Sequence, residues 1–213
     1  MRIKHTTIFT FDELDDPAKE KAREWYRDGA LDYDWWEFIY SGLENVLTAL
    51  GGDIDLKKTY FSGFYHQGSG SSFTGNITAR GVLAAIDAHT LDGVAPELRL
   101  PKAPTIHPLI RKAIDSRAIE IDGSCCAGRG YGGETNLVTD SQVYSDSFCI
   151  DEYPRIDAQC TAVAEWLEEI LTDINHCFFT SLEHSFEYLT SDECVDETIL
   201  ANAYEFDASG HIA

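Results

Sequence analysis

The spacing of apolar residues along the first part of the chain predicts both helices and strands. Residues 1–11 alternate between apolar and polar positions, as in a short strand. Asp16 and Pro17 are typical of a helix start, and the helix they open is predicted over 16–27. Apolar residues then recur every three or four positions over 32–50, which predicts a second helix. The β-prone segment 54–78 has a loop of glycine and serine in its middle and is predicted to form a hairpin.

The rest of the chain continues this mixture. Short helices are predicted over 80–91 and 109–117, on either side of a proline-rich connection. A second hairpin is predicted over 119–144, with a glycine-rich turn. The longest helix begins at Tyr153 and Pro154 and has an apolar stripe from Val163 to Phe186. A capping-box pattern at 190–193 starts another helix, and 203–206 reads as a terminal strand.

These elements predict the α+β class. We expect an antiparallel sheet made from the two hairpins and the terminal strands, with helices packed on one face and a long acidic C-terminal helix. The length of 213 residues fits a single domain over 1–213. The prolines near 92–108 mark an internal boundary or an exposed loop.

The net charge of the chain limits the possible binding partners most. The net charge is −21, and fifteen acidic residues from position 151 onward face a single basic residue, Arg155. Direct binding of nucleic acid needs clustered lysine and arginine, so we expect none. The chain has no export signal and no apolar run long enough to span a bilayer, which predicts a cytoplasmic location and no membrane partner.

No motif specifies a reaction. The six cysteines include no CxxC pair, and Cys160 and Cys177 fall in an apolar stripe, where buried free thiols are expected. The histidines have no metal-ligand spacing, and the phenylalanines near His176 and His184 favour packing. We therefore name no catalytic residue, no metal site and no cofactor, and we favour a function without catalysis.

Two glycine-rich loops are candidates for binding a small ligand. They combine aromatic rings, hydroxyl and amide groups, and glycines that let backbone N–H groups approach a ligand, which suits a nucleotide-like molecule. The alternative is a hairpin whose aromatic rings pack under the sheet. The candidate ligand-binding residues are Tyr60, Ser62, Phe64, His66, Gln67, Gly68, Ser69, Gly70, Arg129 and Tyr131.

A second candidate surface would bind a protein. On adjacent helical positions Trp35 and Trp36 would lie about 100° apart, so one could be buried while the other reaches the helix flank as an anchor, but the favoured alternative is that both are partly buried. Acidic residues of the C-terminal helices could imitate the phosphates of DNA, although such a face can also be merely solvated. The candidate partner-binding residues are Trp36, Glu165, Glu168, Glu169, Asp173, Glu183, Asp192, Glu193, Asp196 and Glu197.

Three segments resemble an uncharacterised family of tailed-bacteriophage proteins that is loosely labelled antitoxin-like. They are the N-terminal motifs between Phe11 and Glu37, the YFSGF and QGSG motifs at 60–70, and the EYLTSDE and ANAYEF motifs at 187–193 and 201–206. The resemblance covers about half of the chain. It implies a phage or prophage gene expressed in the bacterial cytoplasm, and it carries over no catalytic residue.

The leading hypothesis is a phage-encoded accessory protein that binds and inhibits a host factor. A defence enzyme that handles nucleic acid is the expected target, which makes the chain a counter-defence inhibitor. The alternatives are a protein that sequesters a nucleotide-derived signal through the two loops and an enzyme that acts on a nucleotide. The exposed rings near Phe61 and Tyr65 could also support a homodimer.

Overall fold

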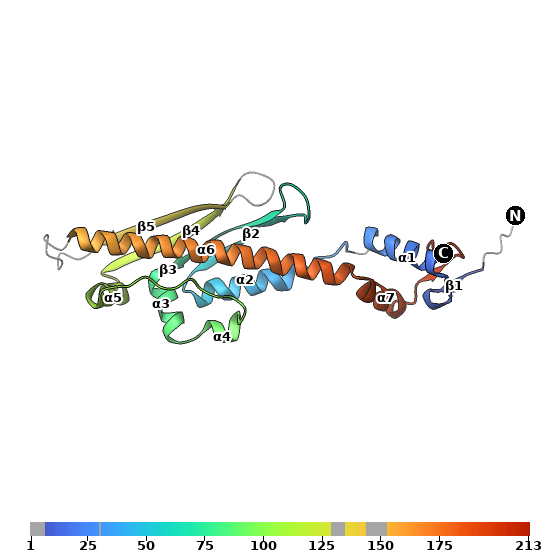
Figure 1. Cartoon of the computed structure of the whole chain (residues 1–213), viewed down its shortest axis with the longest axis horizontal. Helices are drawn as coiled ribbons and strands as arrows, with labels where there is room; N and C mark the ends of the chain where they lie inside the picture. Colours follow the sequence, from blue (N-terminus) through green and yellow to red (C-terminus); the bar gives the residue numbers. More distant parts are fainter. Residues whose placement is uncertain (1–6, 30, 129–134, 144–152) are drawn as a thin grey trace. The chain divides into compact units, whose positions relative to one another are not determined.

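The structure is a computed structural model that describes residues 7–29, 31–128, 135–143 and 153–213. The contacts divide the chain into two compact units, which we describe one at a time (Figure 1). Unit 1 is built from both ends of the chain, residues 1–37 and 182–213, and unit 2 comprises residues 38–181. Within the described ranges, no helix is long and apolar enough to cross a membrane.

Unit 2 contains a four-stranded antiparallel sheet in the order β2-β3-β4-β5. The strands are β2 (Asp53–Ser62), β3 (Gly70–Thr78), β4 (Ile119–Ala127) and β5 (Thr135–Val143). The two hairpins predicted from the sequence are β2–β3 and β4–β5, and they meet where β3 pairs with β4. The register of β2 shifts between Asp55 and Tyr60, which marks a β-bulge.

The helices of unit 2 cover one face of this sheet. They are α2 (Glu37–Ala49), α3 (Ala79–Asp87), α4 (Leu91–Val94), α5 (Pro108–Asp115) and the greater part of α6 (Tyr153–Thr190). Burial alternates along β4, so that Ile119 and Ile121 face the helices while Glu120 and Asp122 lie on the other face. Glycine at position 123 allows close packing, since a Cβ atom there would lie 3.0 Å from the Cβ atom of Leu167 in α6.

Two buried polar contacts fix α6 within unit 2. The Ser71 hydroxyl of β3 donates to the Asn175 side-chain oxygen at 3.0 Å, and the Asn175 amide nitrogen donates back to the Ser71 carbonyl at 3.0 Å. The Trp166 indole N–H donates to the Pro101 carbonyl at 3.0 Å. The proline-rich connection 95–107 has no regular secondary structure and is tied to α6 by this contact.

Unit 1 has its own small core. It contains α1 (Asp16–Gly29), α7 (Asp192–Ala201), the short 3-10 helix η1 (Phe11–Glu13) and the end of α6. Ser191 caps α7, and its hydroxyl accepts a hydrogen bond from the Cys194 backbone N–H. The buried core residues are Phe11, Leu14, Ala18, Ala22, Tyr26, Val195, Ile199 and Phe206.

The terminal strands differ from the expectation. We expected them in the same sheet as the hairpins, but β1 (Phe9–Thr10) and β6 (Glu205–Phe206) pair with each other in a separate two-stranded sheet. The reason is the core they cover, because Phe206 is fully buried against the residues of α1 and α7 and Phe9 packs on the same cluster. The α+β class is confirmed.

Candidate functional site

The first candidate ligand loop, residues 63–69, connects β2 to β3. Gly63, Tyr65 and Gly68 have positive φ angles of 45°, 64° and 96°. The His66 ring lies over Gly63, where a Cβ atom would come within 2.1 Å of the ring nitrogen Nε2. The His66 backbone N–H donates to the Ser69 hydroxyl at 3.1 Å. His66 and Ser69 therefore stabilise the loop itself.

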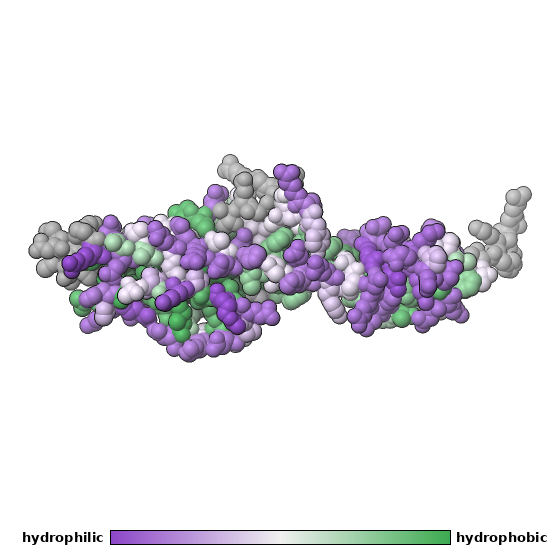
Figure 2. Space-filling view, viewed as in Figure 1, coloured by the Kyte–Doolittle hydropathy of each residue, from purple (hydrophilic) through white to green (hydrophobic). Residues whose placement is uncertain are grey.

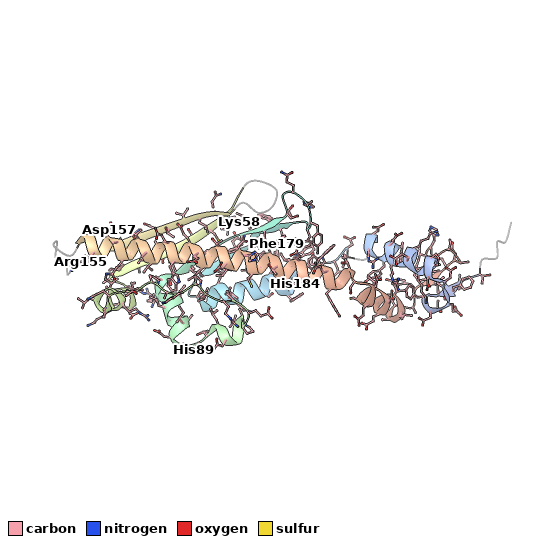
Figure 3. All side chains as sticks on the ribbon, viewed as in Figure 1. Lys58, His89, Arg155, Asp157, Phe179 and His184 are labelled. Atoms are coloured by element: carbon pink, nitrogen blue, oxygen red, sulfur yellow. The ribbon has the colours of Figure 1, made fainter. Side chains whose placement is uncertain are left out.

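The aromatic rings of this loop divide into packed and exposed ones. Phe64 stacks on Phe61 with ring centroids 6.0 Å apart, and its ring centroid lies 5.6 Å from that of Phe179, which Figure 3 labels on α6. Tyr65 is 68% exposed and Tyr60 is 50% exposed. The tip is therefore anchored to α6 through Phe64 and exposes Tyr65, whereas Tyr60 is exposed on β2. The packed interpretation holds for Phe64, and ligand binding by this segment stays a prediction.

The other predicted ligand residues are placed as follows. Ser62, Ser69 and Gly70 are partly buried at the ends of the two strands, and Gln67 and Gly68 are exposed in the loop. Arg129 and Tyr131 lie outside the described residues, so the joining of the two loops in one pocket stays a prediction. No group of three or more His, Cys, Asp or Glu side chains that could hold a metal ion occurs in the described part of the chain.

The histidine and cysteine predictions have mixed outcomes. Cys160 is buried as expected, but Cys177 is only partly buried. His176 and His184 of α6 are exposed, so the prediction that they pack among the phenylalanines is wrong. Phe178 and Phe186 follow these histidines by two positions, which places them about 200° around the helix, on the side opposite the histidines.

The two adjacent tryptophans lie in the turn that precedes α2 and not in the predicted helix, and they differ in burial. Trp35 is buried in unit 1, where its ring lies 6.1 Å from the Phe186 ring. Trp36 is half-buried, and its ring meets Trp35 edge-on at 5.6 Å. Trp36 therefore contributes to packing and still has a surface that a partner could contact.

The predicted acidic residues fall in both units. Glu165, Glu168, Glu169 and Asp173 belong to the unit 2 part of α6, and Glu183, Asp192, Glu193, Asp196 and Glu197 belong to unit 1. Glu168 accepts a hydrogen bond from the Thr139 hydroxyl of β5 at 3.1 Å. Glu165 and Glu169 are exposed.

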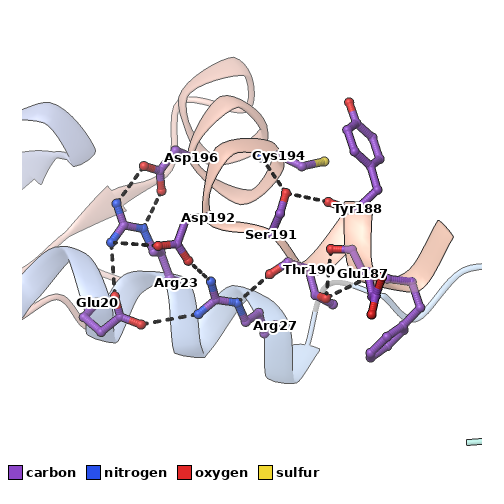
Figure 4. A network of polar contacts seen from close by, with 11 residues as sticks. Glu20, Arg23, Arg27, Glu187, Tyr188, Thr190, Ser191, Asp192, Cys194 and Asp196 are labelled. Atoms are coloured by element: carbon purple, nitrogen blue, oxygen red, sulfur yellow. Dashed lines mark hydrogen bonds and ion pairs between the residues drawn. The ribbon is translucent and has the colours of Figure 1, made fainter. Parts of the chain in front are cut away.

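A network of ion pairs joins α1 to the start of α7 (Figure 4). Arg23 binds Asp196 through two hydrogen bonds of 2.7 Å each. Arg27 pairs with Asp192, and its Nε donates to the Thr190 carbonyl at 2.9 Å. Hydrogen bonding to Asp196 is the main reason that the pKa of Arg23 is raised. Asp192 and Asp196 thus stabilise unit 1, a role that sequence spacing could not reveal because their partners are more than 160 residues away.

The remaining acidic side chains of unit 1 form its outer surface. The described residues 7–37 and 182–213 include eighteen Asp and Glu side chains and four Lys and Arg side chains. Glu24 and Asp28 lie one turn apart on α1, and Glu193 and Glu197 lie one turn apart on α7; all four are exposed. The visible face of unit 1 is mostly hydrophilic (Figure 2). We call these four residues the acidic pairs of unit 1.

Comparison with known proteins identifies a family without assigning an activity. No curated protein and no solved structure matches the chain. A family model described as "Domain of unknown function (DUF8835)" matches residues 35–192, which include all of unit 2. That description gives neither a phage origin nor a partner, so both stay expectations. Since the match covers most of the sequence, the chain belongs to the family described as Domain of unknown function (DUF8835).

Proposed function

We propose that this chain is a non-catalytic accessory protein that binds a basic host protein and inhibits it. The expected target is a defence enzyme that handles nucleic acid, and the binding surface is the acidic surface of unit 1. The observation that carries the proposal is the charge of this unit, in which eighteen acidic side chains face only four basic ones in the described residues.

The ion pairs of unit 1 occupy basic side chains within the unit itself. Arg23 and Arg27 are already bound to Glu20, Asp192 and Asp196, so two of the four basic side chains are occupied within the unit. Their rigid guanidinium groups also hold α1 against α7. The acidic pairs are therefore carried on two helices with a fixed mutual position.

The spacing of the acidic pairs supports imitation of a phosphate array. Residues four apart on a helix rise about 6 Å along the axis. One strand of DNA carries a phosphate about every 3.4 Å along its axis. A single helix is thus about half as dense in charge as one DNA strand, and the packed pair α1 and α7 offers two such rows. A lysine- and arginine-rich DNA-binding cleft is the complementary surface.

Affinity capture from the bacterial host tests the proposal. The full chain should retain a basic protein at about 0.1 M salt and release it as the salt approaches about 1 M, because screening weakens exposed charge pairs. DNA should compete for the same protein. Replacing the acidic pairs with Glu24→Gln, Asp28→Asn, Glu193→Gln and Glu197→Gln should abolish capture.

A matched variant of unit 2 serves as the control. Glu44→Gln, Asp157→Asn, Glu165→Gln and Glu169→Gln remove the same number of exposed charges and should leave capture unchanged. If both variants lose capture to the same extent, binding depends only on net charge. If both variants still capture the basic protein, the acidic surface of unit 1 is not the binding site. Mass spectrometry of small molecules released from the same purified protein tests the alternative of nucleotide sequestration. A bound nucleotide at one per chain would favour that alternative.

A further inference from the structure

An apolar groove lies in unit 2, whereas the acidic pairs belong to unit 1. Its walls come from α2, from the segment 94–98 that follows α4, and from α6. It encloses about 330 Å³. Sites for small molecules in proteins begin at about 300 Å³ and are mostly apolar with few polar groups. The groove therefore has the size and the composition of a small-ligand site.

Large apolar side chains reach solvent at the mouth of this groove. Phe38 of α2 is 67% exposed and Val94 is 40% exposed, although Ile39, Leu43 and Phe178 deeper in the groove are buried. Phe38 and Val94 therefore leave apolar surface accessible beside the buried lining of the groove.

Gly42 keeps the groove open. It lies in the middle of α2, where glycine is among the least favourable residues for a helix. A Cβ atom at this position would meet no other atom within 4 Å, so packing does not require a glycine. Its φ angle is also not positive, so backbone conformation does not require one. We therefore attribute the glycine to the groove, which a large side chain at position 42 would fill.

The groove also has a defined charge. Among the described residues that line it, Glu97 is the only charged one. Burial and the nearby Glu97 carboxylate both raise the pKa of the Cys177 thiol, and both residues line the groove. The Ser181 hydroxyl donates to the Cys177 carbonyl at 2.9 Å and is used within the helix. A ligand in this groove therefore meets apolar walls and one negative charge.

We propose that the groove binds a small apolar molecule that carries one cationic amino group. The apolar body lies against α2 and α6 beside Gly42, and the ammonium group lies beside the Glu97 carboxylate. This site is independent of the protein-binding function proposed for unit 1.

Dansylcadaverine is a suitable probe, because it joins an environment-sensitive apolar fluorophore to a primary amine. Titrated with the full chain, it should bind saturably with a blue shift and increased emission. The matched anion, dansyl-6-aminohexanoate, should bind more weakly. Glu97→Gln should weaken dansylcadaverine by about fivefold, the scale of a partly exposed ion pair, and should remove the preference for the amine. Glu44→Gln, on α2 but outside the groove, should change neither.

Gly42→Leu should abolish binding of the probe, because its side chain fills the groove while its helix propensity favours α2. A second measurement does not depend on that variant. Dansylcadaverine should slow the alkylation of Cys177 in the native chain and leave the alkylation of exposed Cys126 unchanged. The proposal is overturned if the probe does not bind saturably, if the anion binds as tightly as the amine, or if Cys177 is not protected.

Discussion

At the scale of single residues, buried polar groups matter more than the many surface charges. The Ser71 hydroxyl is buried and makes its hydrogen bonds with Asn175, which joins β3 to α6 across 104 positions of sequence. A surface ion pair contributes little because water and salt screen it, whereas an unpaired buried polar group costs free energy. The stability of unit 2 should therefore respond to such buried contacts first.

Ser71→Ala should lower the free energy of unfolding by about 1–2 kcal/mol, because it leaves the Asn175 side-chain oxygen without its donor. Urea unfolding of the full chain measures this loss. Ser124→Ala is the matched control: its hydroxyl bonds the Val138 carbonyl on the uncovered face of β4, and its loss should stay within about 0.5 kcal/mol. Equal losses in the two variants would contradict the argument.

The neighbouring thiols Cys125 and Cys126 should differ sharply in reactivity. Burial raises the pKa of the Cys125 thiol to about 12, so at pH 8 it is protonated, and only the thiolate is a nucleophile. Cys126 points to the other face of β4 and is exposed. At pH 8, the peptide that contains positions 125 and 126 should be alkylated much less in the Cys126→Ser variant, which keeps Cys125, than in the Cys125→Ser variant, which keeps Cys126. Peptide mass spectrometry measures this difference. Rapid modification of Cys125 in the native chain would disprove its burial.

At the scale of elements, two glycines illustrate opposite reasons for the same residue. Gly42 of α2 has empty space where a side chain would be, whereas Gly123 of β4 lies against Leu167. A helix interior loses stability by having glycine instead of alanine. A strand that carries a helix closely on its face gains from having no side chain at the point of contact.

Gly42→Ala should therefore raise the free energy of unfolding by about 0.5–1 kcal/mol. Gly123→Ala should lower it, since its Cβ atom pushes against Leu167 and shifts α6 from β4. Both variants can be compared with the native chain by urea unfolding. Stabilisation by both would show that α6 does not pack as closely on β4 as described.

Many of the helices and strands could be predicted from the sequence, and the features that could not be predicted share one cause. Hairpins and helices arise from local spacing, so β2–β3, β4–β5 and α6 were predictable. The separate pairing of β1 with β6 was not, because nothing local indicates which distant strand shares a core. Among the candidate site residues, Asp192 and Asp196 look like any exposed acids until α1 supplies Arg27 and Arg23. The apolar groove was also missed, because Gly42 lacks any local signal beyond being a glycine inside a helical pattern.

At the scale of the whole molecule, the two units differ in size and in charge. Unit 2 has a four-stranded sheet and a large buried core, whereas unit 1 has a core of eight buried residues and a large excess of negative charge. Small cores bury proportionally less surface, and self-repulsion destabilises a compact state. Unit 1 should be the less stable of the two.

The tryptophans allow this difference to be measured. Trp25, Trp35 and Trp36 belong to unit 1, and Trp166 belongs to unit 2. In a Trp166→Phe variant, fluorescence reports unit 1 alone, while far-ultraviolet circular dichroism reports both units. Fluorescence should change at a lower urea concentration than circular dichroism. Added salt should reduce the difference between the two urea concentrations, because it screens the repulsion between the acidic side chains of unit 1. Coincident transitions at every salt concentration would instead indicate one cooperative domain.

The composition of unit 1 from both ends of the chain has a consequence for synthesis on the ribosome. Residues 7–37 emerge first, but their packing partners on α7 follow only after the 144 residues of unit 2. At roughly 5–20 residues per second, α1 waits roughly 7–30 seconds with the apolar side of Ala18, Ala22 and Tyr26 uncovered. Unit 2 can form its sheet as soon as α6 has emerged, so the unit that begins first is completed last. While unit 2 is being synthesised, the nascent chain thus carries α1 with its apolar side uncovered.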